Sequence, residues 1–319
     1  MAATIKDIAR ISGFGVGTVS RVLNGSPRVS PETRARVLEV ARELRYRPNK
    51  LAKMLVTGRF PDTTIGIILP LITHRFSLEI IGGIYSGLSR SGYNLLVFNL
   101  GKDREQVFEH IRYSHFAGLL ALLDPLKSEE KQMLEEHHSR FIYLDYHEQG
   151  ESSIHYDHFR GGGLAASYLL HKNCRNILFI GDRADTQQRR ERLEGFKDAL
   201  SGREGISLRE VYVEHDEEAA YAAALREIHA GRVEGIFFYC DDLALGGLRA
   251  KRDSGSSIRI VGYDDIQAAG YLGLSTVRQD GDRLGRLGAR QIVELVRAEA
   301  APHEPVSLTL QPELIDRNS

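Results

Sequence analysis

From Thr64 onward, short apolar runs typical of buried β-strands alternate with stretches whose apolar residues recur at helical spacing. The runs cover residues 65–69, 93–98, 118–122, 141–144, 177–180, 235–238 and 258–262. Such alternation favours parallel sheets with helices on both faces. A segment of about 260 residues usually divides into two subdomains, with ligands bound at the carboxyl ends of the strands. We therefore expect a two-lobed α/β core with parallel sheets.

The first 60 residues differ in charge from the rest of the chain. They hold 12 Lys and Arg against 4 Asp and Glu, a net charge of +8, whereas the remaining residues sum to −9. A basic segment of this kind is typical of proteins that bind nucleic-acid phosphates. The charge alone fits a solvated basic face equally well, so the interpretation depends on the motifs within the segment.

The same segment contains the start and stop signals of three short helices. Thr4 has the character of an N-cap, with an acidic residue three positions later, and Gly13 ends this first helix. A second amphipathic stretch covers residues 16–24 and ends at an Asn-Gly pair. A third helix begins with Ser30 as N-cap and ends before Pro48. Two short helices joined by a tight turn, with a third packed across them, predict an all-α helix-turn-helix domain.

The second helix of such a domain places its N-terminal side chains in the major groove of DNA. The candidate positions are Val16, Gly17, Thr18, Ser20 and Arg21. Val16 suits contact with a thymine methyl group, and Arg21 suits bidentate hydrogen bonds with guanine. Val16 could instead face the core, because it lies three residues before Val19 on the helix.

Residues 4–55, TIKDIARISGFGVGTVSRVLNGSPRVSPETRARVLEVARELRYRPNKLAKML, are very similar to the DNA-binding segment of the LacI/GalR transcription regulators. The resemblance implies that DNA is contacted by Thr4, Val16, Gly17, Thr18, Ser20, Arg21 and Asn24. The family usually has Ser at position 15, so Gly15 removes a side-chain cap from the second helix at a cost of roughly a few tenths of a kcal/mol.

Residues 47–55, RPNKLAKML, resemble the hinge helix of that family, which folds when two subunits present it to the minor groove of the operator. The resemblance implies contacts from Asn49, Lys50, Leu51, Ala52, Lys53 and Leu55. Leu55 is then the expected apolar wedge between base steps, whose stacking cost is offset by the bend that it permits. Packing of Leu55 against the core is the alternative.

The resemblance extends, with weaker identity, through the rest of the chain. Residues 192–196 resemble the family's R-x-x-G-F helix, and residues 240–242 stand where the family commonly has Ala-Asn-Asp. The effector-binding residues implied in this way are Phe76, Asp145, Tyr146, Arg192, His215, Asp241, Asp264 and Gln279. Core packing is the alternative for Phe76, and a surface position is the alternative for Arg192.

These candidates predict the chemistry of the effector. Asp145, Asp241 and Asp264 would supply many acceptors around the single Arg192, which suits a neutral polyhydroxyl ligand better than an anion. We therefore expect a sugar or an oligosaccharide. A phosphosugar, a nucleobase or a protein co-repressor is the alternative effector, because other arginine residues nearby could add positive charge.

The sequence contains no motif that predicts an enzyme, such as G-x-S-x-G or H-E-x-x-H. Cys174 and Cys240 give neither a disulfide framework nor zinc-ligand spacing. We expect no catalytic residue, no metal site and no cofactor. A sugar-binding receptor or a carbohydrate-acting enzyme without gene regulation is the alternative function. The basic segment and the missing apolar leader argue against it and favour a cytoplasmic location, and no apolar run is long enough to span a membrane.

The expected fold is an N-terminal all-α helix-turn-helix domain with a hinge helix, followed by a two-lobed, periplasmic-binding-protein-like α/β core with parallel sheets. We place the first domain at residues 1–47, the hinge helix and linker at residues 48–60, and the core at residues 61–319. Within the core, one lobe would comprise about residues 61–155 and 282–305, and the other lobe about residues 156–281 and 306–319.

The expected function is that of a sequence-specific DNA-binding transcriptional regulator, a repressor whose operator affinity is controlled by a small effector. A homodimer matches a pseudo-palindromic double-stranded operator, because the symmetry of the protein then mirrors that of the DNA. The chain stops without a heptad repeat, so we expect a dimer rather than a tetramer built on a coiled coil.

Overall fold

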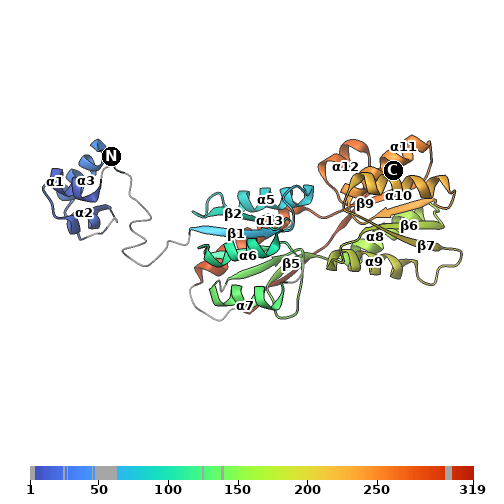
Figure 1. The fold of residues 1–319 in the computed structure, drawn as a ribbon, viewed down its shortest axis with the longest axis horizontal. Coiled ribbons are helices and arrows are strands. Elements are labelled where there is room, and N and C mark those ends of the chain that lie inside the picture. The colour runs from blue at the N-terminus through green and yellow to red at the C-terminus, as the bar shows by residue number, and fades with distance from the viewer. Residues whose placement is uncertain are drawn as a thin grey trace. The chain divides into compact units, whose positions relative to one another are not determined.

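The computed structural model describes residues 4–23, 26, 28–44, 46, 63–101, 103–123, 126–137, 140–298 and 304–319. The chain forms two compact units, Met1–Pro61 and Asp62–Ser319 (Figure 1). The expected hinge helix and linker at residues 48–60 lie outside the described residues, and so do Asn24, Asn49, Lys50, Leu51, Ala52, Lys53 and Leu55.

The N-terminal unit contains the three short helices that the sequence predicts. They are α1 (Ile5–Ser12), α2 (Val16–Leu23) and α3 (Pro31–Glu43). The Thr4 hydroxyl accepts a hydrogen bond from Asp7 N, and the Asp7 carboxylate accepts one from Thr4 N, which together form a capping box. Gly13 ends α1 in the left-handed region, with φ of 78°, where glycine has no steric penalty.

A small apolar core holds these three helices together. Its buried members are Ile8, Val19, Val22, Val37, Val40 and Ala41. Each helix contributes one stripe at helical spacing, so the core is formed by tertiary packing of helices that are too short to be stable alone.

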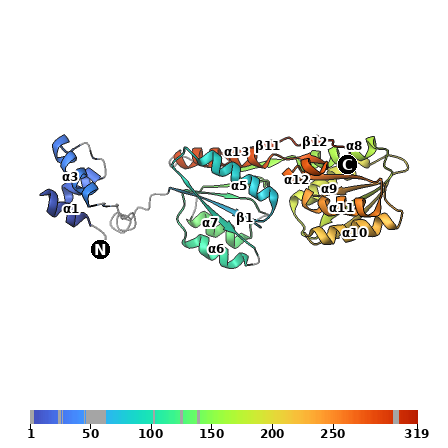
Figure 2. The ribbon, with the colours of Figure 1, turned by 90° about the horizontal axis from the view of Figure 1, so that it is seen from above.

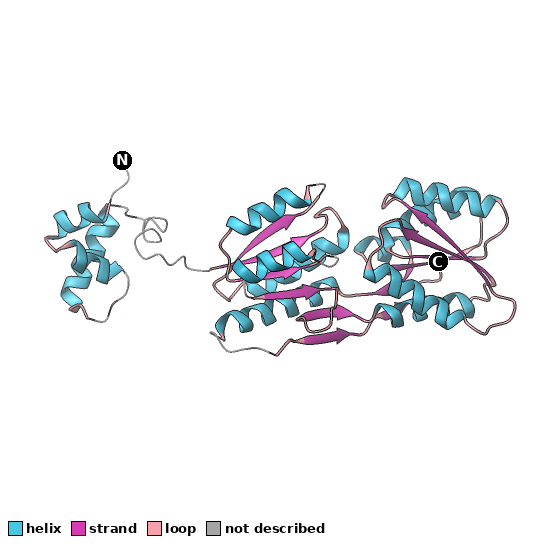
Figure 3. Ribbon diagram, turned by 60° about the horizontal axis from the view of Figure 1, so that its bottom comes forward, coloured by secondary structure: helices cyan, strands magenta, loops and turns pink. Residues whose placement is uncertain are grey.

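The larger unit is built on two six-stranded sheets (Figure 3). The first sheet has the order β11-β5-β4-β3-β1-β2, and the second has the order β12-β10-β9-β8-β6-β7. The strands of the first sheet are β1 (Thr64–Leu69), β2 (Asn94–Asn99), β3 (Gly118–Ala121), β4 (Phe141–Leu144), β5 (Ser153–Tyr156) and β11 (Ser307–Leu310). Those of the second sheet are β6 (Asn176–Asp182), β7 (Ser207–Val213), β8 (Gly235–Phe238), β9 (Arg259–Asp264), β10 (Ser275–Arg278) and β12 (Glu313–Ile315). All described pairings are parallel except that of β10 with β12, which confirms the expected fold class.

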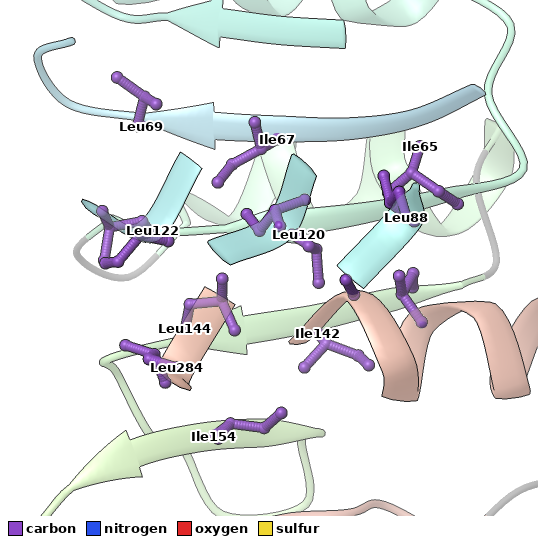
Figure 4. Packing of buried hydrophobic residues seen from close by; sticks show 14 of the residues in the cluster. Ile65, Ile67, Leu69, Leu88, Leu120, Leu122, Ile142, Leu144, Ile154 and Leu284 are labelled. Atoms are coloured by element: carbon purple, nitrogen blue, oxygen red, sulfur yellow. The ribbon is translucent and has the colours of Figure 1, made fainter. Parts of the chain in front are cut away.

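The first sheet and its helices form the first lobe. The helices are α5 (Arg75–Leu88), α6 (Arg104–Tyr113), α7 (Ser128–His137) and α13 (Gly281–Arg297). α5 and α13 cover one face of the sheet, and α6 and α7 cover the other (Figure 2). Ile67, Leu120 and Leu144 from neighbouring strands belong to the same buried cluster as Leu88 and Leu284 of the covering helices (Figure 4).

The second sheet and its helices form the second lobe. The helices are α8 (His158–His171), α9 (Gln187–Leu200), α10 (Glu217–His229), α11 (Asp241–Ser254) and α12 (Gln267–Leu272). α8 and α9 pack on one face of the sheet, and α10, α11 and α12 contribute to the cluster on the other. Because both faces are covered, the central strands β6, β8 and β9 are mostly apolar, which explains why these three are recognisable in the sequence.

The chain passes between the two sheets after β5, after β10 and between β11 and β12. Tyr156 pairs with Leu310 at the ends of β5 and β11, so both residues belong to the first sheet. The expected assignment of residues 306–310 to the second lobe is therefore wrong, and the second lobe resumes only near β12. The error arose because β11 is short and its exposed residues carry little of the apolar pattern of a central strand.

His155 links β11 to its neighbour β5. Its Nε2 lies 3.2 Å from Thr309 Oγ1, and its ring stacks on His147 with centroids 4.4 Å apart. Burial, together with the nearby His147, lowers the pKa of His155 to about 4. The unfolded chain therefore binds a proton that the folded chain does not bind between about pH 6.5 and pH 4.

We predict that the core loses stability as the pH falls from 6.5 to 4, and that His155→Gln reduces this loss. Glutamine keeps a polar atom that reaches Thr309 but does not titrate. Thermal unfolding of both proteins across this pH range measures the effect. Above pH 7 the two should respond equally to pH, because His155 is then neutral in both states. If the melting temperature changes equally with pH in both proteins between pH 6.5 and 4, the loss of stability does not come from His155.

Candidate functional site

Helix α2 presents the residues that the sequence singles out for DNA. Val19 and Val22 are buried in the core of the unit, whereas Val16 is 44% exposed. Val16 therefore does not pack in the core of the unit, which was the alternative. Arg21 is also exposed, and a Cβ added to Gly17 would meet no atom within 4 Å. This surface offers a methyl-bearing side chain, bare backbone and a guanidinium group, a combination suited to base edges in a major groove.

Thr18 and Ser20 on α2 are half-buried. Thr4 is exposed at the start of α1, where its hydroxyl also donates to Asp7 Oδ2 at 2.7 Å. The Thr4 hydroxyl is thus already engaged in the capping box, so a contact with DNA would have to share it.

In the core unit, five buried polar side chains meet near the carboxyl ends of the strands, and we call them the Arg192 cluster. They are Asp145 after β4, His158 at the start of α8, Arg192 on α9, Asp264 at the end of β9 and Gln279 after β10. All five are less than 9% exposed. The cluster includes both Asp145 of the first lobe and Arg192 of the second.

The guanidinium group of Arg192 is held on several sides. Nε donates to His158 Nδ1 at 3.2 Å, and Nη1 donates to the Tyr239 carbonyl oxygen at 2.6 Å. Nη1 also lies 3.6 Å from Asp264 Oδ1, and the guanidinium carbon lies 3.7 Å from the centroid of the Tyr263 ring. A buried charge of this kind is stabilised by ion pairing, hydrogen bonds and a cation–π contact together. The surface alternative for Arg192 is therefore wrong.

Asp264 and Gln279 complete the other end of the cluster. Gln279 Nε2 donates to Asp264 Oδ1 at 2.7 Å, while Gln279 Oε1 is buried without a partner among the described residues. Burial raises the pKa of Asp264, although the Arg192 charge opposes this shift. Asp264 has φ of 110° and Asp145 has φ of 57°, two left-handed conformations that surrounding contacts must enforce. A buried acceptor without a partner is a candidate contact for a ligand hydroxyl.

A second group, which we call the His215 cluster, joins the two lobes. Its members are His74, Arg75, Asp182, His215 and Asp242. His215 Nδ1 lies 2.8 Å from Asp182 Oδ2, and its ring stacks on His74 with centroids 4.4 Å apart. Arg75 of α5 forms an ion pair with Asp242 of α11. Burial lowers the pKa of His215, but the hydrogen bond with Asp182 and the negative charges of Asp182 and Asp242, the latter 3.9 Å from Nε2, outweigh it and raise the pKa to about 9. His215 is therefore a cation at neutral pH, surrounded by fixed charges.

Asp241 lies apart from the hydrogen bonds of the Arg192 cluster. It is fully buried at the start of α11, where Oδ1 accepts from Thr276 Oγ1 at 2.7 Å and Oδ2 accepts from Ile266 N at 3.0 Å. A Cβ on Gly262 would lie 2.0 Å from Asp241 Oδ1, so only glycine fits there. Both carboxyl oxygens are used within the protein, which indicates that Asp241 connects α11 to β10 and α12.

Two further candidates pack mainly in apolar surroundings. Tyr146 is buried with Tyr143, their ring centroids 4.9 Å apart, in the cluster beneath α6 and α7. Phe76 is half-buried on α5 and packs against the main core of the first lobe, close to Gly281. The described packing of both aromatic rings thus lies within the first lobe.

Sequence reasoning missed several residues that the fold brings to these clusters. They are His74, His158, Asp182, Tyr239 and Tyr263. Asp182 ends strand β6, and Tyr263 lies within β9, so strand-end position was a usable signal for Asp182. His158 carries no local signal, because its role depends on β4, α8 and α9 meeting in space.

Among the described residues, no group of three or more His, Cys, Asp or Glu side chains is arranged to hold a metal ion. None of the described helices is both long and apolar enough to cross a membrane.

The Asp241 carboxyl group has an unusual protonation equilibrium. Burial raises its pKa well above the usual range, and the nearby Asp264 adds to the shift. The folded state then holds a proton that the unfolded state releases as the pH rises above about 3.8, so stability falls as the pH rises through this window.

We predict that Asp241→Asn stabilises the core at neutral and alkaline pH. The amide oxygen of asparagine can accept from Ile266 N, its NH2 group faces Thr276 Oγ1, whose hydroxyl then accepts instead of donating, and the amide binds no proton. The gain should grow with pH by up to about 1.4 kcal/mol per pH unit and vanish in acid. Chemical unfolding at several pH values measures it.

Asp242→Asn is the matched control, because the positive charges of His215 and Arg75 lower the pKa of Asp242 despite its burial. That variant should lose stability at neutral pH. Destabilisation by Asp241→Asn at every pH would show that the carboxylate is required in its charged form.

Comparisons with known proteins agree with this architecture. Residues 4–49 match the model for bacterial regulatory proteins of the lacI family, and residues 166–319 match a periplasmic binding protein-like domain. The chain is 32% identical to the HTH-type transcriptional regulator CelR of Thermobifida fusca, over 99% of this chain and 98% of that protein. It is 29% identical to the HTH-type transcriptional repressor PurR of Vibrio atlanticus, with the same coverage.

Solved structures show the same fold over nearly the whole chain. A Lac repressor dimer bound to operator and an anti-inducer has a TM-score of 0.84 at 22% identity, covering 99% of this chain and 98% of that one. A CelR–cellobiose complex has a TM-score of 0.71 at 28% identity, covering 98% of each chain. The chain therefore belongs to the lacI family of bacterial regulatory proteins and is a helix-turn-helix transcriptional regulator.

Proposed function

We propose that this regulator is a cytoplasmic repressor that binds a pseudo-palindromic operator as a homodimer and is controlled by a neutral sugar, most simply a β-linked glucose disaccharide. The Arg192 cluster is the proposed effector site, and the exposed face of α2 is the proposed reading surface. Residues Asn49, Lys50, Leu51, Ala52, Lys53 and Leu55 are proposed to contact the minor groove, with Leu55 as the wedge, and Asn24 to contact DNA beside α2.

The DNA-binding proposal is supported by the separation of roles on α2. Val19 and Val22 hold the helix in the unit, whereas Val16, Gly17 and Arg21 are free of the core. The basic charge of residues 1–60 attracts phosphates without regard to sequence, and the α2 side chains then discriminate base pairs.

The effector proposal rests on one observation, the buried Gln279 Oε1 that has no described partner beside the Arg192–Asp264 pair. A hydroxyl group both donates and accepts, so it can donate to this oxygen and accept from a guanidinium N–H. A neutral sugar supplies several such groups without adding a charge to a site rich in carboxylates. The cellobiose bound to the CelR relative makes cellobiose the first ligand to test.

Control of operator affinity requires only modest energy. A hundredfold change corresponds to about 2.7 kcal/mol of coupling between the effector site and the DNA-binding unit. Binding that favours one arrangement of the two lobes supplies such coupling, whether the sugar acts as an inducer or as a co-repressor.

We predict that the full chain selects a pseudo-palindromic duplex from a random pool, with an affinity that falls about a thousandfold or more between 50 and 200 mM salt. Cellobiose at 100 times its Kd should increase the free energy of unfolding of the core by about 2.7 kcal/mol and so raise its melting temperature. It should also change the affinity for the operator. Calorimetry, thermal unfolding and a DNA-binding assay measure these effects.

The outcomes of this experiment separate the alternatives. Stabilisation by a sugar phosphate or a nucleobase, with no response to neutral sugars, would replace the proposed effector class. Turnover of bound cellobiose would favour the carbohydrate-acting enzyme. Equal affinity for all duplexes would show that the protein does not recognise a specific operator.

We predict that Gly17→Ala stabilises the N-terminal unit by about 0.5–1 kcal/mol, because alanine replaces glycine in a helix where its Cβ meets nothing. The same methyl group should change the base preference of the selected duplex. Gly82→Ala on α5 is the matched control, since its Cβ also meets nothing. That variant should stabilise the core and leave duplex selection unchanged. An unaltered preference in the Gly17 variant would remove this position from the reading surface.

A further inference from the structure

His158 bridges the two charged partners of the Arg192 cluster. Its Nε2 lies 3.1 Å from Asp145 Oδ1, and its Nδ1 lies 3.2 Å from Arg192 Nε. The ring is 2% exposed, and the Asp145 side chain is 5% exposed. No sequence motif or matched family segment described above assigns His158 a role.

The chemistry of the two partners fixes the proton on the imidazole ring. Arg192 Nε can only donate a hydrogen bond, so His158 Nδ1 must accept it and cannot carry a hydrogen. The hydrogen of neutral imidazole then lies on Nε2, which donates to the Asp145 carboxylate. The Tyr263 hydroxyl lies 3.4 Å from Nδ1 and can donate a hydrogen bond to the same lone pair.

Asp145 is itself held firmly enough to orient the ring. Its backbone N donates to the Ile154 carbonyl at 2.8 Å, and Gln188 Nε2 donates to the Asp145 carbonyl. These bonds hold Asp145 in its left-handed conformation with φ of 57°. The backbone at the end of β4 therefore fixes the position of Asp145, and Asp145 in turn orients the imidazole ring.

The other bonds of Arg192 leave one nitrogen available. Nη1 is engaged by the Tyr239 carbonyl and approaches Asp264, and Tyr263 covers a face of the guanidinium group. Once His158 holds Nε, the planar guanidinium group has a single orientation. In the described part of the core, Nη2 has no hydrogen bond of its own.

We propose that His158 is a positioning residue of the effector site: neutral, and hydrogen-bonded to Asp145, it holds Arg192 Nε so that Nη2 is presented to the effector. The inference rests on the effector function proposed above. It adds a residue of α8 that acts through Arg192, together with a required protonation state.

A proton on Nδ1 would break this arrangement, because imidazolium is a donor at both nitrogens and faces the Arg192 cation. Burial lowers the pKa of His158, with Asp145 opposing the shift and Arg192 and His147 adding to it. The other titratable groups close to the ring are Tyr263 from β9, which contacts it, and His155 from β5, which interacts with it electrostatically. Acidification should therefore weaken effector binding through loss of the Nδ1 acceptor.

Two substitutions divide the ring's functions. In His158→Asn the amide oxygen reaches the position of Nδ1 and accepts from Arg192 Nε, but nothing reaches Asp145. In His158→Gln the amide reaches the position of Nε2 and contacts Asp145, but no acceptor faces Arg192. Both variants lose the titrating group, and both keep a polar side chain of similar size.

The first measurement uses cellobiose and isothermal titration with the full chain. We expect the Kd to rise at least tenfold in His158→Gln and no more than about threefold in His158→Asn. In an Arg192→Lys background the two substitutions should have equal effects, because lysine has no Nε–H for residue 158 to hold. The fall in affinity below pH 6 should be smaller in His158→Asn than in the wild type, with the titration of Asp264 common to both.

The second measurement needs no effector. The NMR signal of the Arg192 Nε–H group is identified by its loss in Arg192→Lys. The hydrogen of this group should exchange slowly with water in the wild type and in His158→Asn, and rapidly in His158→Gln. Equal exchange in all three proteins would overturn the positioning role. Equal losses of affinity and of melting temperature in the Asn and Gln variants would also overturn it, since they would show a structural role only. If wild-type protein binds no neutral sugar, the proposed effector class fails, while the exchange measurement still decides the role of His158.

Discussion

The burial of the Arg192 guanidinium group constrains the whole region between the two lobes. An isolated charge in this position would cost several kcal/mol of desolvation, so the surrounding groups must supply compensating contacts. A carbonyl oxygen from the end of β8, a carboxylate from the end of β9 and an imidazole from α8 all converge on it. The carboxyl ends of the strands are thus fixed by one cation, and His158 extends that constraint to Asp145 in the first lobe.

Contacts between the lobes outside this cluster are polar and replaceable. Gln187 exchanges hydrogen bonds with the backbone of His147, and Arg75 pairs with Asp242. Partly exposed pairs of this kind each contribute roughly 1 kcal/mol or less, unlike the apolar packing within each lobe. A ligand that bonds to groups from both lobes therefore competes with only a few kcal/mol of existing contacts. This balance is what allows a small molecule to select one arrangement of the lobes.

The features that the sequence predicted are those with local causes. The Thr4 cap, the Gly13 stop and the buried strands depend on residues within a few positions of each other, so the pattern specifies them. Arg192 and Asp264 were named through resemblance, and their burial follows from the sheet order. The bonds of Asp241 to Thr276 and Ile266, the place of β11 and the bridge made by His158 depend on which strand ends meet, which no local pattern encodes. Asp241 was grouped with the effector residues through the same resemblance, which does not reveal that both of its carboxyl oxygens bond within the protein.

In the N-terminal unit different residues stabilise the fold and recognise the ligand, whereas in the core unit the same residues do both. In the N-terminal unit, Val19 and Val22 stabilise α2 while Val16 and Gly17 make no core contact, so a new base preference costs little stability. In the core unit, Arg192 and Asp264 are buried and also form the proposed ligand site, so removal of either leaves an uncompensated charge that costs roughly 3–5 kcal/mol. Substitutions on α2 can therefore change the preferred operator at little cost in stability, whereas a new effector must be accommodated by groups around a charged centre whose loss destabilises the core. The available variation lies in partly exposed residues such as His74 and His215, which contact both lobes without supporting either core.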